Sequence, residues 1–290
     1  MGTLNVGVRL HDLLPGTVEE RIALAGHMGF TCIQLPTKVL YASYGIDRTG
    51  LTHALADHLR ECLDAAGVRV AVLGCYKNLA VPDENVLADQ IAEYEATLRF
   101  ASWLGGCPVG TETGRPNADN KIADDRFLPH VLKGFTEALG EVVAVAEGLD
   151  GTILIEPGWN EVVCTVERCR FVLDAVPSKA LGVIFDPVSL LHPRVVGQAS
   201  ALTARMLHEC GERIRVLHAK DYEVVDNENA AEWCDGSGSR LVCRGAGETG
   251  AFDFSQLAVW AQQGRFDIDC IVENGTPETL AACRDYLLTM

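Results

Sequence analysis

The 290-residue chain has 24 basic and 40 acidic side chains, a formal net charge of −16 at pH 7, and a hydrophobic content of 48%. This composition predicts a globular protein with a large apolar core, and the length suits one closed α/β barrel. The acidic balance, without any dense lysine or arginine run, would repel a phosphate backbone or an anionic membrane surface, so we expect neither nucleic acid nor a membrane as a partner.

Short apolar, β-branched runs predict eight strands, at residues 5–10, 31–36, 69–75, 108–113, 152–157, 182–187, 215–220 and 270–275. Amphipathic stretches between and after them predict eight helices, at residues 18–29, 51–67, 85–105, 127–148, 162–176, 197–211, 252–264 and 277–288. This alternation indicates parallel strands joined by crossover helices. We therefore expect a single (β/α)₈ TIM barrel domain over residues 1–290, with an open doubly wound sheet as the alternative.

The longest irregular stretch, at about residues 222–251, follows the seventh predicted strand and is expected to be an extended loop. Its segment "RGAGETG", Arg244–Gly250, matches the G-x-G-x-x-G pattern of dinucleotide-binding loops. A dinucleotide fold needs several more βαβ units after its glycine loop, and the chain is too short for them. We therefore predict a tight turn at the barrel mouth and no nucleotide cofactor.

Polar residues of metal-binding type stand at the ends of the last four predicted strands. In a (β/α)₈ barrel the reactive groups lie at the carboxyl ends of the strands. An ionised carboxylate at the end of a buried strand is costly unless a cation or hydrogen bonds compensate it. Three carboxylates and one imidazole suit one hard or borderline divalent ion, with Mn²⁺ expected and Mg²⁺ or Co²⁺ as alternatives. These residues are Glu156, Asp186, His218 and Glu273.

Five successive motifs, "ILIEPGWN", "GVIFDPVSLL", "VLHAKDYE", "GAGETGAFDFSQL" and "CIVENG", resemble the signatures of the sugar phosphate isomerase/epimerase family. These are xylose isomerase-like TIM barrels that include ketose 3-epimerases and inosose dehydratase. The resemblance spans essentially the whole chain and implies that Glu156, Asp186, His218 and Glu273 are the metal ligands. It also implies that Glu156 and Glu273 are the catalytic acid/base pair and that the substrate is a small carbohydrate.

Two positions depart from the ketose epimerase pattern. Ser189 replaces a histidine three residues beyond the aspartate, and the nearest histidine is His192. Val224 replaces an arginine six residues beyond the metal-binding histidine. Because both missing groups contact substrate in that branch, a simple ketose 3-epimerase is not the only interpretation.

The predicted ligands support several reactions. A metal-bound carbonyl and its neighbouring hydroxyl would acidify an adjacent C–H, which one glutamate could deprotonate. Proton return then gives an isomerase or epimerase, whereas loss of a hydroxyl or of CO₂ gives a dehydratase or decarboxylase acting on a keto-sugar, inosose or sugar acid. A non-catalytic sugar-binding barrel is a weaker alternative because both glutamates are retained. A DNA-repair endonuclease of the endonuclease IV type would need further histidine and aspartate ligands, which are missing.

Other polar residues near strand ends are candidates for contact with a carbohydrate, which needs hydrogen-bonding groups and an aromatic face. An Arg9–Glu112 ion pair, or a Trp159 that caps the core, would explain those residues without a substrate. Lys220 and Asp221 could instead orient His218. The candidates are Arg9, His11, Tyr76, Glu112, Trp159, His192, Lys220 and Asp221.

The chain does not begin like a signal peptide, and no apolar run approaches the roughly 18 residues of a membrane span, so we expect a cytoplasmic protein. The 11 cysteines lack a C-x-x-C pair and lie mostly in apolar runs, which predicts buried thiols. Cys234 and Cys243 flank a polar loop, where a free thiol pair is expected and a disulfide or zinc pair is the alternative. The sequence leaves the oligomeric state open, a homo-oligomer being one option.

Overall fold

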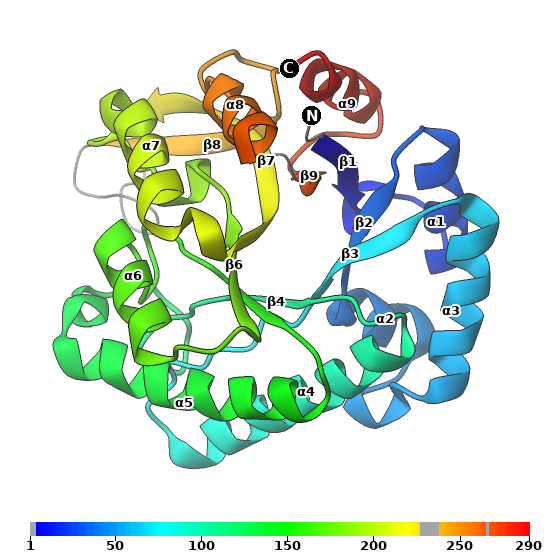
Figure 1. Cartoon of the computed structure of the whole chain (residues 1–290), viewed down its shortest axis with the longest axis horizontal. Coiled ribbons are helices and arrows are strands. Elements are labelled where there is room, and N and C mark those ends of the chain that lie inside the picture. Colours follow the sequence, from blue (N-terminus) through cyan, green and yellow to red (C-terminus); the bar gives the residue numbers. More distant parts are fainter. Residues whose placement is uncertain (1–3, 227–237, 265–266) are drawn as a thin grey trace.

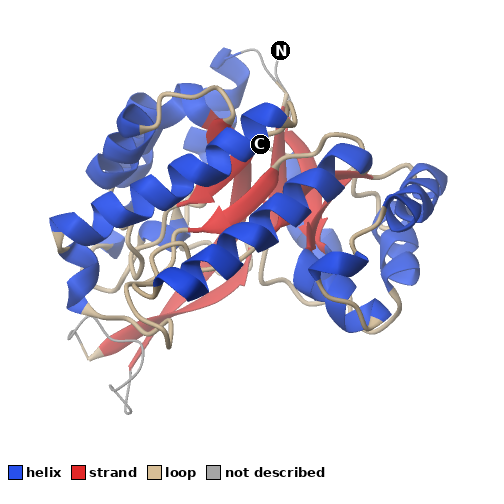
Figure 2. Cartoon of the chain, turned by 90° about the horizontal axis from the view of Figure 1, so that it is seen from below, coloured by secondary structure: helices blue, strands red, loops and turns tan. Residues whose placement is uncertain are grey.

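A computed structural model describes residues 4–226, 238–264 and 267–290. Its central feature is a closed ring of eight parallel strands, since every strand of the ring pairs with the next and β1 pairs with β9. Figures 1 and 2 show these strands surrounded by helices. The ring consists of β1 (Leu4–Arg9), β2 (Cys32–Pro36), β3 (Arg69–Gly74), β4 (Val109–Glu112), β5 (Ile153–Glu156), β6 (Leu181–Phe185), β7 (Ile214–Asp226) and β9 (Ile268–Val272).

Helices cover the outside of the ring, and polar N-caps begin several of them. Thr17 and Glu20 form a capping box at the start of α1, and Asp83 accepts two backbone N–H groups at the start of α4. No helix in the described ranges is long and apolar enough to cross a membrane. The helices are α1 (Val18–His27), α2 (Thr37–Tyr44), α3 (His53–Ala66), α4 (Glu84–Trp103), α5 (Pro129–Gly148), α6 (Val166–Ala175), α7 (Ala199–Cys210), α8 (Ser255–Gly264) and α9 (Leu280–Leu288).

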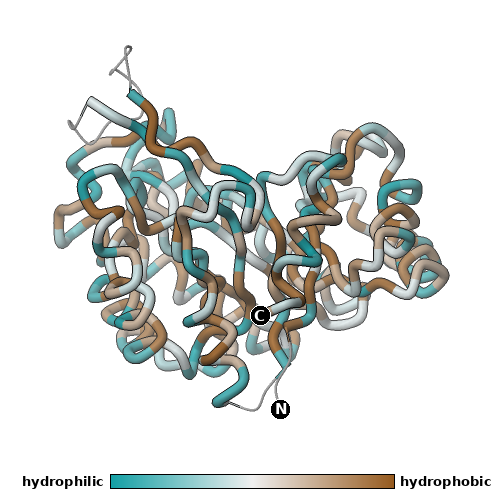
Figure 3. The backbone as a smooth tube through the Cα atoms, turned by 90° about the horizontal axis from the view of Figure 1, so that it is seen from above, coloured by the Kyte–Doolittle hydropathy of each residue, from teal (hydrophilic) through white to brown (hydrophobic). Residues whose placement is uncertain are grey.

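Alternation along the strands divides the core into two clusters. Ile153 and Ile155 of β5 belong to the large cluster packed under the helices, whereas Leu154 belongs to a small separate cluster. That small cluster fills the barrel and consists of Cys32, Ala71, Val72, Leu154, Ile184, Val216 and Ile271. Figure 3 shows hydrophobic segments running through the centre of the molecule. Residues two positions beyond this inner cluster therefore point into the barrel mouth.

The structure confirms the (β/α)₈ TIM barrel and differs from the sequence prediction in two places. Residues 37–44 form an additional helix, α2, directly after β2. The expected irregular loop at 222–251 is partly regular, because β7 continues to Asp226 and pairs antiparallel with β8 (Ser239–Gly245). This hairpin projects from the barrel in Figure 2. The short apolar pairs Val224–Val225 and Leu241–Val242 are compatible with strands, although neither forms the longer apolar run by which the other strands were predicted.

Candidate metal centre and surrounding cavity

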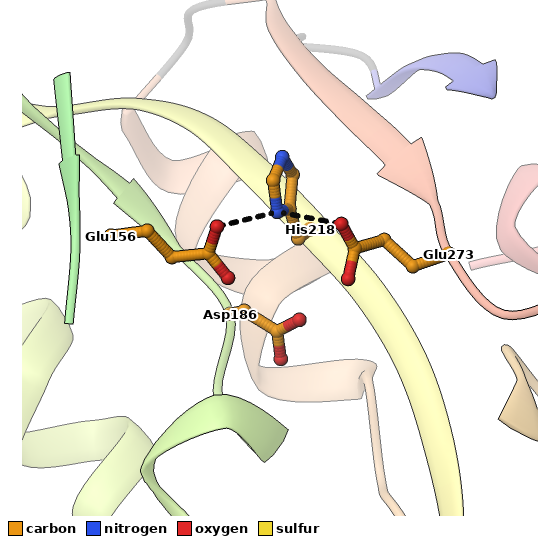
Figure 4. A group of neighbouring side chains, drawn as sticks. All are labelled: Glu156, Asp186, His218 and Glu273. Atoms are coloured by element: carbon orange, nitrogen blue, oxygen red, sulfur yellow. Dashed lines mark ion pairs between the residues drawn. The ribbon is translucent and has the colours of Figure 1, made fainter. Parts of the chain in front are cut away.

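Four predicted ligand residues meet at the barrel mouth, and we call them the four-residue cluster: Glu156, Asp186, His218 and Glu273. Glu156 ends β5, Asp186 directly follows β6, and Glu273 directly follows β9. His218 comes from within β7, two residues beyond the inner Val216. One donor atom from each residue lies within 4.8 Å of the others, and all four residues are buried (Figure 4).

The imidazole of His218 lies between two carboxylates. Its Nδ1 atom is 3.3 Å from Glu156 Oε2 and 3.2 Å from Glu273 Oε1. Neither ring nitrogen has a hydrogen-bond partner among the described residues, although the side chain is fully buried. Buried polar atoms are nearly always partnered. The converging carboxylates, with the Nδ1 atom of His218 between them, therefore fit a divalent cation held by these residues.

Hydrogen bonds fix the carboxylate of Asp186 before any cation binds. Its Oδ1 atom accepts the backbone N–H groups of Val188 at 2.8 Å and Ser189 at 3.1 Å. Its Oδ2 atom has no hydrogen bond of acceptable geometry but lies 2.8 Å from the Lys220 ammonium. One oxygen is thus used by the turn after β6, and the other stays available to a cation.

Lys220 and Ser189 link the two glutamates. Lys220 Nζ donates to Glu273 Oε2 at 3.2 Å and to Ser189 Oγ at 2.9 Å, and Ser189 Oγ donates to Glu156 Oε1 at 3.1 Å. Ser189, which replaces the histidine of the ketose epimerases, therefore orients Glu156 in this chain. Lys220 supplies a positive charge that partly balances the acids.

The charges of the cluster shift its pKa values in opposite directions. Burial would lower the pKa of His218, but the carboxylates of Glu273 and Glu156 outweigh burial and raise it. Burial would raise the pKa of Glu273, but Lys220, His218 and Arg9 outweigh burial and lower it. Burial raises the pKa of Asp186 against the opposing charge of Lys220. Glu273 is therefore ionised at neutral pH.

A cavity of about 580 Å³ opens above the cluster and contains most of the predicted contact residues. Trp159 and His192 form part of its wall, with ring centroids 5.4 Å apart. Arg9 binds Asp12 at 2.8 and 3.1 Å and lies 3.5 Å from Glu273, so the Arg9–Glu112 ion pair considered from sequence is not formed. The predicted residues that line the cavity are Arg9, His11, Tyr76, Glu112, Trp159, His192 and Lys220.

Glu112 stands beside Glu156, its register partner on β5, and close to a second acid that the sequence prediction missed, Glu161. Burial raises the pKa of Glu112, and the negative charge of Glu156 raises it further. Glu161 is 4% exposed, and its Oε2 accepts Thr113 N at 2.6 Å and Gly114 N at 3.2 Å. Its place five residues after Glu156, in the same connection, is the only sequence signal that could have found it.

Asp221 does not line the cavity, although it adjoins Lys220 in sequence. As a neighbour of an inward-facing residue, it points to the other face of β7, where it is fully buried. Its carboxylate accepts backbone N–H groups from Tyr222, Thr249, Gly250 and Phe252 at 2.8–3.1 Å. It therefore holds the "GAGETG" turn, and we do not carry it forward as a substrate contact.

The glycine turn is shaped by its packing as well. Gly247 has φ of +79°, and a Cβ atom there would lie 2.6 Å from the ring of Tyr286. Both the left-handed backbone and the contact require glycine. Cys243 has a free thiol on the cavity wall, and Cys234 lies outside the described residues.

Among the other cavity residues that the sequence prediction missed are Gln34, Lys38 and Arg115. Gln34 is the one polar residue in the otherwise apolar run Cys32–Pro36, and this was a usable signal. Lys38 lies on the unpredicted helix α2, and Arg115 lies in a connection without a periodic pattern. Neither of these two has a comparable signal.

Residues 22–280 match the family described as xylose isomerase-like TIM barrel. Because this match covers most of the chain, the protein belongs to that family. The match agrees with the closed barrel and with the motifs around the four-residue cluster. A comparison with curated proteins found no match.

Solved structures of similar fold include several enzymes. A 3-keto-D-glucoside 4-epimerase from E. coli is 14% identical, with 99% of this chain and 100% of that chain covered and a TM-score of 0.69. A probable 3-DHS dehydratase from Bacillus anthracis is 13% identical, with 99% and 98% covered and a TM-score of 0.72. A Mycobacterium smegmatis xylose isomerase-like TIM barrel protein in complex with magnesium is 14% identical, with 100% and 96% covered and a TM-score of 0.69. At these identities the likeness establishes the fold alone.

Proposed function

We propose that the protein is a divalent-metal-dependent enzyme that isomerises or epimerises a sugar or keto-sugar. The observation that carries this proposal is the placement of two glutamates on either side of His218, from β5 and β9, at the floor of an open cavity (Figure 4). Acid/base chemistry on both faces of one carbon needs such a pair. The epimerase of similar fold supports the same class.

The four-residue cluster would hold the cation, with Mn²⁺ expected and Mg²⁺ or Co²⁺ as alternatives. When bound, the ion would polarise a carbonyl and its neighbouring hydroxyl and so acidify the C–H beside them. Glu273, whose pKa is lowered by Lys220, His218 and Arg9 against the effect of burial, is ionised and can accept that proton. Glu156, held by the hydroxyl of Ser189, would start this step protonated and give its proton to the other face of the carbon, so that the two glutamates exchange protonation states in one turnover.

A dehydratase or decarboxylase acting on a keto-sugar, inosose or sugar acid is the second candidate. It is favoured by Glu112, which lines the cavity and whose pKa is raised by burial and by Glu156. A raised pKa lets a carboxyl group hold its proton to higher pH, which favours donation of that proton to a leaving hydroxyl. The dehydratase of similar fold supports this candidate.

The test is proton exchange in D₂O with Mn²⁺ and a panel of keto-sugars, inososes and sugar acids, followed by NMR. We expect deuterium uptake at one carbon, with an epimer or isomer as product, whereas an unsaturated product would favour the dehydratase. Glu156→Gln and Glu273→Gln keep the side-chain shape but remove the proton acceptor, so net turnover should fall by about a thousandfold or more at saturating metal.

The matched control is Glu137→Gln, which removes an exposed carboxylate on α5 and should leave turnover unchanged. Metal content is measured in each variant, because lost occupancy would imitate lost chemistry. If both metal-loaded variants at the cluster turn over at the wild-type rate, the glutamates are not the acid/base pair.

A further inference from the structure

The cavity wall built by β1, β2 and β3 has buried polar atoms without partners. Gln34 lines the cavity, is 2% exposed, and its Oε1 atom accepts no hydrogen bond from the described residues. The buried Nδ1 atom of His11 on the same wall is also unpartnered. Buried polar atoms nearly always have partners, and because these two lie on the cavity wall, a bound ligand can supply them.

The β2 part of this wall faces Asp186 across the barrel, whereas β1, which leads into His11, pairs with β9 and stands beside Glu273. In the ring of eight strands, β2 stands four positions from β6, which carries Asp186 at its end. A ligand that reaches the cluster with one end can therefore reach Gln34 and His11 with the other. The two orphaned atoms would meet the part of a substrate that does not react.

A positive charge without an acidic partner stands beside these atoms. Among the basic side chains of the cavity, Arg9, Arg115 and Lys220 have carboxylates within 4.0 Å. Lys38, an exposed residue at the rim of the cavity, has none in the part of the chain that the structure describes, and its ammonium lies 5.9 Å from the ring centroid of Tyr76. In a chain with a formal charge of −16, an unpaired cation in a cavity suggests an anionic ligand.

The start of α2 adds to this charge. The helix begins at Thr37, directly after β2, with no side-chain N-cap and no acidic residue in its first turn. The partial positive charge of its N-terminus is therefore not neutralised locally. Arg240, on the β7–β8 hairpin, also lines the cavity without an acidic partner in the described ranges, but no orphaned buried atom accompanies it.

We propose that this wall binds a carboxylate at the end of the substrate that does not react, through His11, Gln34 and Lys38, with Tyr76 holding the Gln34 amide in place. The substrate is then a sugar acid rather than a neutral sugar, an inference that rests on the proposed function for its reacting end. On this wall Lys38 supplies a single uncompensated full charge, which matches a carboxylate better than a doubly charged phosphate. The NH₂ group of Gln34 donates to the Tyr76 hydroxyl. If the amide is rotated by 180°, its Oε1 atom accepts a hydrogen bond from that hydroxyl instead, and the NH₂ group points to the ligand.

The experiment is calorimetric binding to the Mn²⁺-loaded chain of three matched probes: D-fructose, D-fructuronate and D-fructose 6-phosphate. We expect D-fructuronate to bind at least about tenfold more tightly than the other two, because a charge-assisted contact has this magnitude. Lys38→Met should remove the preference without weakening fructose binding, and Lys38→Arg should retain it. Lys77→Met is the matched control, since Lys77 is paired with Glu93 at 3.7 Å and does not line the cavity.

Three results would overturn the subsite: equal binding of fructose and fructuronate, tighter binding of the phosphate, or a preference that survives Lys38→Met. A preference that disappears in Arg240→Met instead would place the anion on the hairpin and also reject the proposal. Proton exchange in D₂O is recorded separately on the same samples. Selective fructuronate binding without any exchange would reject the proposed reaction while leaving the subsite supported, so the two failures are distinguishable.

Discussion

Buried carboxylates near the carboxyl ends of the strands have two opposite kinds of surroundings. In the four-residue cluster, carboxylates converge on one another and on His218, whose nitrogens lack hydrogen bonds among the described residues. Three residues further along β7, Asp221 is equally buried, but four backbone N–H groups point at its two oxygens. Backbone donors thus satisfy both oxygens of Asp221, whereas the cluster leaves Asp186 Oδ2 and the His218 nitrogens without a hydrogen bond among the described residues.

This difference gives a physical criterion for distinguishing a structural acid from a ligand. Burial alone does not separate them, because removing either carboxylate from water has a similar cost. The donors that surround each oxygen do separate them. Loss of a satisfied acid should destabilise the fold, whereas loss of an unsatisfied acid should mainly remove cation binding.

The largest expected effect is the loss of metal binding when the cluster loses a donor. His218→Ala and Asp186→Ala each remove one of four donors, and we expect affinity for Mn²⁺ to fall by roughly a thousandfold, more than the 10–100-fold typical of outer-shell changes. Metal content by mass spectrometry and Mn²⁺ titration by calorimetry measure the effect. His192→Ala is the control, because His192 lines the cavity outside the cluster. Unchanged occupancy in both cluster variants would refute the ligand assignment.

A smaller effect, on stability rather than metal, is expected at the satisfied acid. Asp221→Ala leaves backbone N–H groups of the 249–252 turn without their acceptor, and we expect the free energy of unfolding to fall by about 3 kcal/mol. Metal bound per folded chain should not change. Urea denaturation measures the first quantity, with Asp226→Ala, at the exposed end of the same strand, as the control. If Asp221→Ala is as stable as the wild type but lacks metal, Asp221 contributes to metal binding and is not a structural acid.

The same two regions explain how far the sequence could predict the structure. The strand-end residues Glu156, Asp186 and Glu273 were predictable because each follows an apolar run and belongs to a motif of the family. Asp221 was misplaced because the prediction used its adjacency to His218 and ignored strand alternation, which turns odd and even residues of β7 to opposite faces. Gln34 would have been found by that rule, since it lies two residues beyond the inward Cys32.

Other parts of the site could not be predicted because no local pattern encodes them. The orphaned nitrogens of His218 and the link from Lys220 through Ser189 to Glu156 depend on closure of the barrel, which joins β5, β6, β7 and β9. Lys38 could be placed on the cavity wall only once helix α2 was known. That helix is short and lacks a side-chain N-cap, so the sequence did not predict it. Local sequence therefore predicted which residues end strands, and tertiary closure determined what they contact.

The smallest expected effect concerns an acid that has donors but is not buried, Glu19 on α1. Its Oε1 atom lies 2.9 Å from His58 Nε2 and accepts the Tyr44 hydroxyl at 2.7 Å, while its side chain remains 35% exposed. Slight burial would raise its pKa, but the hydrogen bonds, that from His58 first, lower it from 4.5 to about 2. A lowered pKa stabilises the fold above the unfolded value and loses that contribution as pH falls through the folded value.

Glu19→Gln should therefore reduce the free energy of unfolding at pH 7 by less than about 1 kcal/mol, because solvent screens exposed pairs. The difference from wild type should shrink as pH falls from 4.5 towards 2, the interval between the unfolded and folded pKa values. Urea midpoints at pH 7, 5, 4 and 3 measure it, with Glu95→Gln, an exposed acid on α4, as the control. A loss at pH 7 as large as that of Asp221→Ala would mean that hydrogen-bond donors alone, without burial, determine how strongly an acid stabilises this barrel.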